Sequence, residues 1–118
     1  MNDNSEKLVS ELTEIGFSKN NAAVLVCLHQ YEISTQRDIE RKMDLRQPEV
    51  SLAIKKLTDK NMISIYDSQS TGKGRPVKIY RLSLPLYKII ENYQDERERE
   101  HLIWKLRIET LIKKCKDN

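Results

Sequence analysis

The residues with the most distinctive chemistry lie at positions 46–60, in the sequence RQPEVSLAIKKLTDK. A glutamine can bond the exposed edge of adenine, a lysine can bond guanine or a phosphate, and a leucine can contact the methyl group of thymine. Side chains of these types, presented together, indicate contact with the major groove of double-stranded DNA. The candidate DNA-binding residues of this segment are Arg46, Gln47, Ser51, Leu52, Lys55 and Lys56.

The same segment predicts a short helix that turns these side chains outward. Pro48 suits the first helical position, and Glu49 suits the positive end of the helix dipole. The apolar residues recur at helical spacing and form one stripe for burial, made of Val50, Ala53, Ile54 and Leu57. An ordinary amphipathic surface helix has the same pattern. The helix alone therefore does not decide between DNA contact and a plain surface position.

The charge of the chain is concentrated around this helix. The net charge is only +3 over 118 residues. Residues 1–45 carry a net charge of −3, residues 46–81 carry +5, and residues 82–118 carry +1. A phosphate-binding surface requires such a local excess of positive charge.

A second group of basic residues falls in a predicted β-hairpin. Residues 62–66 and 77–82 are rich in β-branched and aromatic side chains, which favours two strands. The turn between them contains Gly72 and Gly74, where the backbone could approach a phosphate closely. Arginine at such a tip can enter a minor groove, although a solvated loop has the same composition. The candidate contacts here are Lys73, Arg75 and Lys78.

Three further helices are expected before the basic one. Residues 5–15 predict a helix that ends at Gly16, with an apolar stripe of Leu8, Leu12 and Ile15. Residues 19–31 are apolar almost all round, which is typical of a helix at the centre of a core.

The third helix, over residues 36–43, begins at a capping-box pattern made of Thr35 and Asp38. Residues 44–46 then form a tight turn into the basic helix, and two short helices joined in this way are a helix-turn-helix pattern. The side chains expected to be mostly buried across the chain are Val24, Leu25, Leu28, Ile39, Val50, Ile54, Leu57, Ile63, Ile65 and Ile79.

A long helix is expected from Pro85 to Lys116. Its middle, residues 95–100, is charged all round, so the sequence leaves open whether the helix is continuous or folds back there. The residues after it are again rich in apolar side chains, four of them at the 4-3-4 spacing of a coiled-coil seam. A monomer would expose an unusually large apolar patch here, which predicts a homodimer. The predicted interface consists of Leu102, Ile103, Trp104, Leu106, Ile108, Leu111, Ile112 and Cys115.

Other chemistry is poorly represented. His29 and His101 have no neighbours at metal-ligand spacing, and Cys27 and Cys115 form no Cys-x-x-Cys pair. No nucleophile–base pair stands out, so we expect no catalytic residues, no metal, no cofactor and no enzyme. The absence of a secretory signal and of an apolar run of about 20 residues predicts a cytoplasmic protein.

The order of these elements resembles the winged helix-turn-helix of prokaryotic transcription regulators, with the closest likeness to the TrmB-like and MarR-like groups common in archaea. The segments that carry the resemblance are residues 14–18, 45–51, 57–63 and 74–80. The resemblance implies a recognition helix at 47–60, a wing at 63–82, and a homodimer on paired half-sites of double-stranded DNA. The resemblance covers residues 5–82 and does not include the large effector-binding domain of TrmB-like regulators, so it implies no sugar effector, and any small-molecule effector stays unidentified.

The predicted fold is therefore mainly α with a small β-hairpin (α+β). It consists of a winged helix-turn-helix DNA-binding domain at 5–82 and a C-terminal dimerisation helix at 85–116. The alternative interpretation is a winged-helix module that binds another protein and assembles through its last helix. Salt-sensitive binding to duplex DNA distinguishes the two.

Overall fold

The computed structural model describes residues 3–67 and 76–117. The chain divides into two compact units, Met1–Leu86 and Tyr87–Asn118, which are described separately below. The elements of the first unit are α1 (Asp3–Glu14), α2 (Lys19–Tyr31), β1 (Ser34–Thr35), α3 (Gln36–Met43), α4 (Gln47–Asp59), β2 (Ile63–Asp67) and β3 (Lys78–Leu82). The second unit consists almost entirely of α5 (Leu86–Lys116).

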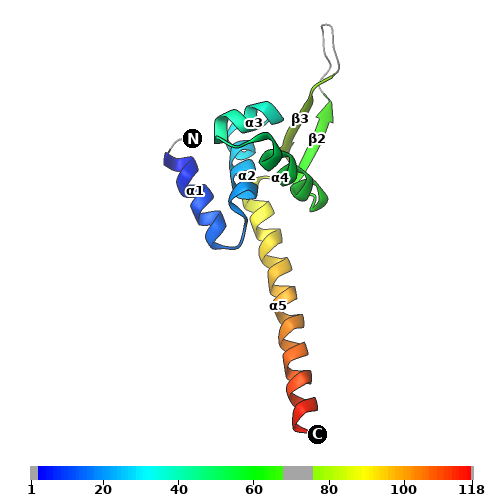
Figure 1. Ribbon diagram of the computed structural model, residues 1–118. Helices are drawn as coiled ribbons and strands as arrows, with labels where there is room; N and C mark the ends of the chain where they lie inside the picture. Colours follow the sequence, from blue (N-terminus) through cyan, green and yellow to red (C-terminus); the bar gives the residue numbers. More distant parts are fainter. Residues whose placement is uncertain (1–2, 68–75, 118) are drawn as a thin grey trace. The chain divides into compact units, whose positions relative to one another are not determined.

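The centre of the first unit is α2, as its apolar sequence predicts. All seven residues from Ala22 to Leu28 are buried. Ser18 begins the helix, because its side chain accepts a hydrogen bond from the main-chain N–H of Asn21 at 3.2 Å. Helices α1, α3 and α4 all contact α2 (Figure 1), so this one apolar helix organises the others.

Helix α1 packs through a different stripe from the predicted one. Its buried residues are Ser5, Val9 and Leu12, whereas Leu8 is half-buried and Ile15 is exposed just after the helix ends. The buried face includes a polar residue, Ser5, which the apolar periodicity of the sequence does not include. Ser5 is small enough for close packing, and its hydroxyl donates a hydrogen bond to Gln30 Oε1 at 2.7 Å.

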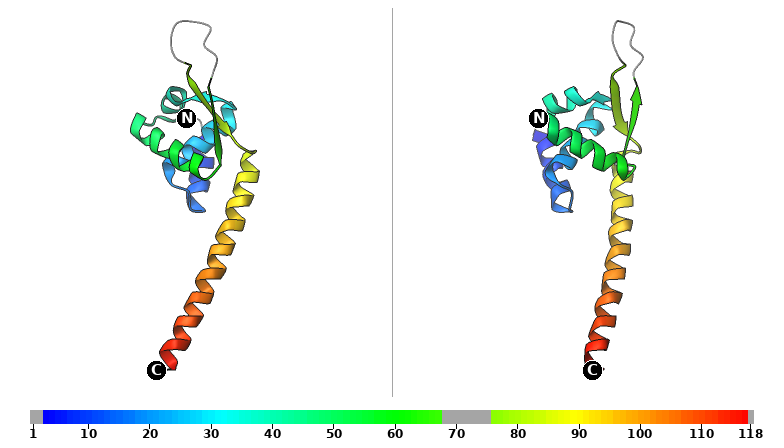
Figure 2. Two further views of the ribbon diagram at one scale, coloured as in Figure 1. Left: turned by 90° about the vertical axis from the view of Figure 1, so that its right-hand side faces the viewer. Right: turned by 45° about the vertical axis from the view of Figure 1, so that its right-hand side comes forward.

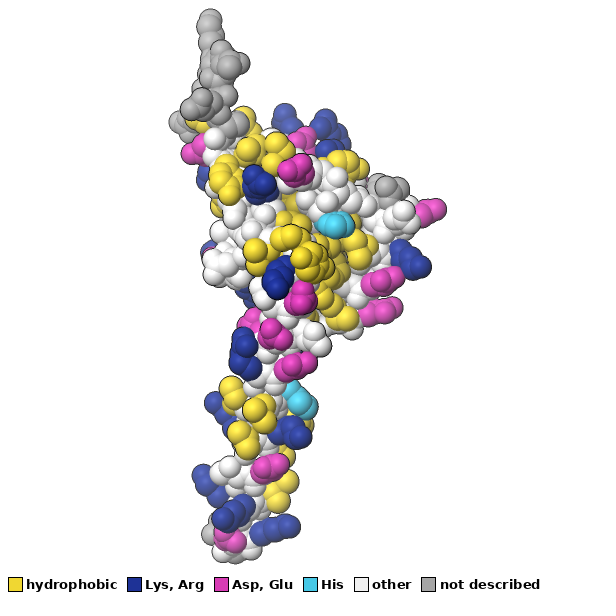
Figure 3. Space-filling model, turned by 180° about the vertical axis from the view of Figure 1, so that it is seen from behind, with side chains coloured by type: hydrophobic (Ala, Val, Ile, Leu, Met, Phe, Trp, Pro, Cys, Tyr) yellow, Lys and Arg dark blue, Asp and Glu magenta, His cyan; other side chains and the backbone are white. Residues whose placement is uncertain are grey.

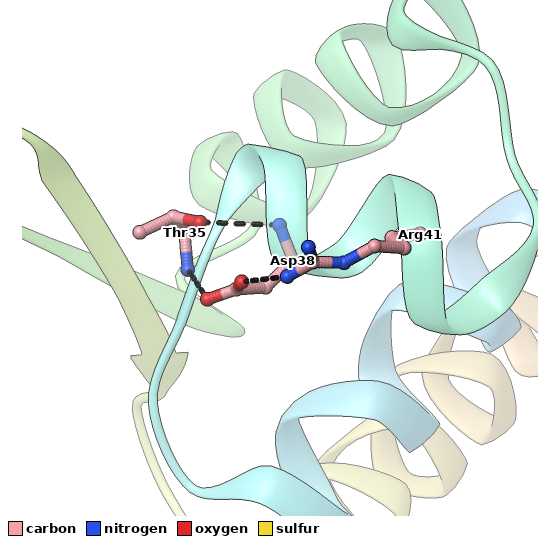
Figure 4. A network of polar contacts seen from close by, with 3 residues as sticks. All are labelled: Thr35, Asp38 and Arg41. Atoms are coloured by element: carbon pink, nitrogen blue, oxygen red, sulfur yellow. Dashed lines mark hydrogen bonds and ion pairs between the residues drawn. The ribbon is translucent and has the colours of Figure 1, made fainter.

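Helix α3 begins with the capping box that the sequence predicts. Thr35 Oγ1 accepts a bond from the Asp38 main-chain N–H, and Asp38 Oδ2 accepts one from the Thr35 N–H, both at 3.1 Å (Figure 4). Arg41 adds an ion pair to Asp38 at 3.0 Å. The helix ends at Asp44, which has a left-handed φ of 54°, and the chain turns from there into α4.

The sheet has three antiparallel strands in the order β1-β3-β2 (Figure 2). The two long strands start one residue later than predicted, and Ile65 of β2 lies directly opposite Tyr80 of β3. Strand β1 is an addition that the sequence did not predict. It is only two residues long, and it places Thr35 opposite Ile79.

The predicted core is correct for the helices but wrong for one strand position. Ile63 is buried, whereas Ile65 is 42% exposed and Ile79 is only half-buried. Ile63 lies at the start of β2, at the base of the hairpin and opposite Leu82. Ile65 comes two residues farther along the strand, where it borders an open hollow.

The second unit is a single helix. Helix α5 runs without interruption for 31 residues, so the charged run at 95–100 does not break it. Its later half carries exposed hydrophobic side chains among charged ones (Figure 3). Within the described residues, none of the helices combines the length and apolar character needed to cross a membrane.

Candidate nucleic-acid interface

Helix α4 has the rotational position that its apolar stripe predicts. Val50, Ala53, Ile54 and Leu57 are all buried. On the other side Leu52 is 55% exposed, and Lys55 and Lys56 are exposed as well. The candidate base-contacting residues therefore lie on the solvent side of the helix, with Ser51 half-buried at its edge.

The start of α4 differs from the expectation by one position. Gln47 is the first helical residue, Pro48 the second and Arg46 the N-cap. Pro48 still removes no helical hydrogen bond, because the first N–H groups of a helix have no partner inside it. Glu49 Oε1 accepts a bond at 2.9 Å from the Arg46 main-chain N–H, which fixes the chain where it enters the helix.

A polar network links the two helices of the helix-turn-helix. Gln36, the first residue of α3, places its Nε2 2.8 Å from Ser51 Oγ and 3.5 Å from the main-chain oxygen of Gln47. Gln47 Nε2 also lies 3.3 Å from Ser51 Oγ. Gln36 was not among the predicted site residues, and its position directly after the capping residue Thr35 is the only sequence signal that could have singled it out.

A shallow hollow of about 320 Å³ lies between α4 and the hairpin. It brings three of the predicted site residues together, since Ser51 and Lys55 from α4 and Lys78 from β3 all line it. Burial raises the pKa of Tyr80, so this phenol lines the hollow as a neutral group at ordinary pH. The remaining lining residues are Gln36, Ile54, Thr58, Asp59 and Ile65.

The charge of the described surface around α4 is mainly positive. Arg46, Lys55, Lys56 and Lys60 are exposed on or beside the helix, and the exposed acids there are Asp59 and, two residues before Arg46, Asp44. On the hairpin, Arg81 is exposed and its guanidinium carbon lies 5.8 Å from the centroid of the Tyr66 ring. Such contact holds an arginine over an aromatic face without neutralising it. The candidate wing-tip contacts Lys73 and Arg75 lie outside the described residues, so their role stays a prediction.

Other reactive groups do not assemble into a site. Cys27 is buried, and burial raises its pKa, which keeps the thiol protonated and unreactive. Cys115 is exposed on α5. Among residues 3–67 and 76–117, no group of three or more His, Cys, Asp or Glu side chains is arranged to hold a metal ion.

Comparison with known families gives a match over most of the chain. The model of the DnaD N-terminal domain matches residues 5–101. Among proteins of curated function, none matches this sequence.

Solved structures of winged-helix proteins resemble this chain. The structure of TrmBL2, an archaeal chromatin protein, superposes with a TM-score of 0.62 at 19% identity. The match covers 92% of this chain and 40% of that chain, and TrmBL2 is described as showing a novel mode of DNA binding. A MarR family regulator from Neisseria meningitidis gives 0.52 at 19% identity, over 96% of this chain and 89% of that chain. MepR, a transcription regulator of the Staphylococcus aureus efflux pump MepA, gives 0.51 at 21% identity, over 83% and 73%. Likeness at these identities shows the fold, and it confirms the winged helix-turn-helix that the sequence resembles.

Proposed function

This chain belongs to the DnaD N-terminal domain family and has a winged helix-turn-helix fold, and on these premises we propose that it is a double-stranded DNA-binding regulator of transcription. The observation that carries the proposal is the outward face of α4. Its apolar stripe is buried, which leaves Gln47, Leu52 and Lys55 on the side that a major groove could receive.

The hairpin supports the same proposal. Lys78 of β3 lines one side of the hollow whose other side carries Lys55 of α4. Two cations on opposite walls of a concave surface suit a phosphate backbone that passes between a recognition helix and a wing. Lys73 and Arg75 lie outside the described residues, and we keep for them the contact with the backbone or the minor groove that the sequence predicts.

The test is the salt dependence of binding to a random duplex, followed by fluorescence anisotropy between 50 and 200 mM salt (about a fourfold range). We expect affinity to fall steeply, and the double variant Lys55→Ala/Lys78→Ala to flatten the slope of log K against log salt by about 1.8, or 0.9 for each lost phosphate contact. Lys7→Ala, which removes an exposed lysine on α1, is the matched control and should leave the slope unchanged.

A second variant tests the face of α4 itself. Ser51→Glu places a negative charge beside the proposed groove and should abolish duplex binding while leaving the circular dichroism spectrum unchanged. A folded wild-type protein that shows no salt-sensitive binding to any duplex would contradict the proposal. That result would favour the alternative, a winged-helix module that binds another protein.

We also propose that the protein acts as a homodimer through the later half of α5. Seven large apolar side chains there are between 38% and 58% exposed. Trp104, Ile108, Leu111 and Cys115 follow the 4-3-4 spacing of a helix pair, which would cover one face. Leu102, Ile103 and Leu106 lie away from that face at about 100° per residue, and Ile112 lies at its edge, so the interface would extend beyond a two-helix seam.

Dimerisation would also serve recognition. One recognition helix reads only a few base pairs, and regulators of this shape gain specificity by pairing half-sites about 34 Å apart. An isolated helix of this length with so much apolar surface gains most of its stability from packing. The dimer would therefore stabilise α5 and bring two copies of α4 to one DNA site.

A further inference from the structure

We propose that Gln36 is a positioning residue that sets the base preference of the recognition helix through Ser51 and Gln47. This inference rests on the proposed DNA-binding function and goes beyond it, because it says which base edges the start of α4 can accept. Gln36 belongs to α3, the other helix of the helix-turn-helix, and is itself half-buried.

The two contacts of Gln36 fix the orientation of its amide. Its Nε2 faces the main-chain oxygen of Gln47 at 3.5 Å and Ser51 Oγ at 2.8 Å. A main-chain carbonyl can only accept hydrogen bonds, so the group turned toward it must be the NH₂ and not the oxygen of the amide. Ser51 Oγ is therefore an acceptor in its contact with Gln36.

The remaining hydrogen-bonding capacity of Ser51 follows from this. A serine hydroxyl has one proton and two acceptor sites. Both acceptor sites are used, by Gln36 Nε2 at 2.8 Å and by Gln47 Nε2 at 3.3 Å. The proton of Ser51 is then left to donate outward, toward an acceptor in the major groove. Guanine, adenine and thymine present such acceptors there, whereas cytosine presents the N4 amino donor.

The same network leaves Gln47 ready for adenine. One N–H of its amide is directed at Ser51, so its other N–H and its Oε1 remain available. These two groups are the donor and acceptor that pair with N7 and N6 of adenine. The duplex that fits has adenine at the position that Gln47 reads. At the adjacent position, the strand that Ser51 reads can carry any base except cytosine.

Gln36 can direct these groups because its own backbone is held on two sides. The residue before it, Thr35, makes both bonds of the capping box with Asp38 at 3.1 Å. Thr35 also pairs with Ile79 of β3 in the sheet. The side chain of Gln36 therefore starts from a fixed point, which lowers the entropy lost when the network forms.

The experiment is a binding selection on randomised duplexes with the full chain, its Gln36→Ala and Gln36→Glu variants, and Gln94→Ala as a control on α5. We expect Gln36→Ala to weaken the preference at the two positions by roughly two- to tenfold, the range for one lost hydrogen bond. Affinity for random duplex should stay unchanged, because Gln36 carries no charge. In Gln36→Glu the carboxylate accepts a hydrogen bond from the Ser51 hydroxyl, which leaves Ser51 Oγ free to accept one from N4 of cytosine, so cytosine should become acceptable at the position that Ser51 reads.

The outcomes separate this proposal from the one on which it depends. Preferences that are the same in both variants as in the wild type would overturn the role of Gln36 while leaving DNA binding intact. An equal loss of specific and random binding, together with a lower melting temperature, would reduce Gln36 to a structural residue and also overturn it. Failure of the wild type itself to bind any duplex would overturn both proposals.

Discussion

Ile54 and Leu52 lie two residues apart on α4 and are buried to opposite extents, 6% and 55% exposed. They provide a matched test of which way the helix faces, since each can be shortened to alanine in the same secondary structure. Ile54→Ala should destabilise the first unit and spare the proposed DNA-binding face. Leu52→Ala should do the reverse.

The expected magnitude for Ile54 follows from its burial. The substitution removes three carbon groups, each worth about 0.8 kcal/mol when buried, so the transfer contribution is about 2.4 kcal/mol. The cavity left among Val50, Leu57 and α2 adds to this, and we expect about 3 kcal/mol in total. For a unit of this size that corresponds to a melting temperature lower by roughly 12–24 °C. Leu52→Ala should change stability by no more than about 0.5 kcal/mol.

Both variants are measured by thermal and urea unfolding, and then by duplex binding at a temperature where each is folded. We expect Ile54→Ala to bind as the wild type does once folded, and Leu52→Ala to lose a preference for thymine through its missing methyl contact. If the two substitutions destabilised the protein equally, or if only Leu52→Ala did so, α4 would be turned differently and Lys55 would no longer face outward.

The homodimer is tested by Ile108→Glu, which puts a charge in the proposed seam of α5. In sedimentation the variant should run as a monomer where the wild type runs as a dimer, and Trp104 should become accessible to a quencher. The control Asn92→Glu, earlier in the same helix, should leave the dimer intact. A wild type that sediments as a monomer would show that α5 does not pair. For Asp38, the hydrogen bond from the Thr35 main chain holds the pKa of the carboxyl below its usual value, so its stabilising contribution is present above about pH 4 and is lost as the pH falls through the lowered pKa. Asp38→Asn should therefore reduce stability by roughly 0.5–1 kcal/mol at pH 7 and by less at pH 3, measured by urea unfolding. A difference that stayed constant across this range would mean that the charge of Asp38 contributes nothing.

Local sequence signals predicted the features that depend on neighbouring residues. The stripe through Val50, Ile54 and Leu57 set the rotation of α4, because apolar periodicity and burial have the same period in a helix. The pattern of Thr35 and Asp38 identified the start of α3 for the same reason, since both bonds of a capping box join residues three positions apart.

Features that depend on distant residues were missed or misplaced. Strand β1 has only two residues, and it exists because β3 passes beside it, which nothing in its own sequence indicates. Ile65 has the residue type of a core position and lies opposite the buried Tyr80, but its own side chain borders an open hollow. Gln36 shows the same limit within the candidate site, since its importance comes from a bond to Ser51, fifteen residues away.

Thr35 belongs to two structures at once, and this has a mechanical consequence. It is a residue of β1, paired with Ile79 of β3, and it is also the N-cap of α3. A displacement of β3 would therefore act on the start of α3 through the two pairs that β1 forms with it, Ser34 with Tyr80 and Thr35 with Ile79. The next residue is Gln36, which holds Ser51 and Gln47 at the start of α4. A shift of β3 would thereby reach the start of α4 through Thr35 and Gln36, so we expect the hairpin and α4 to move together.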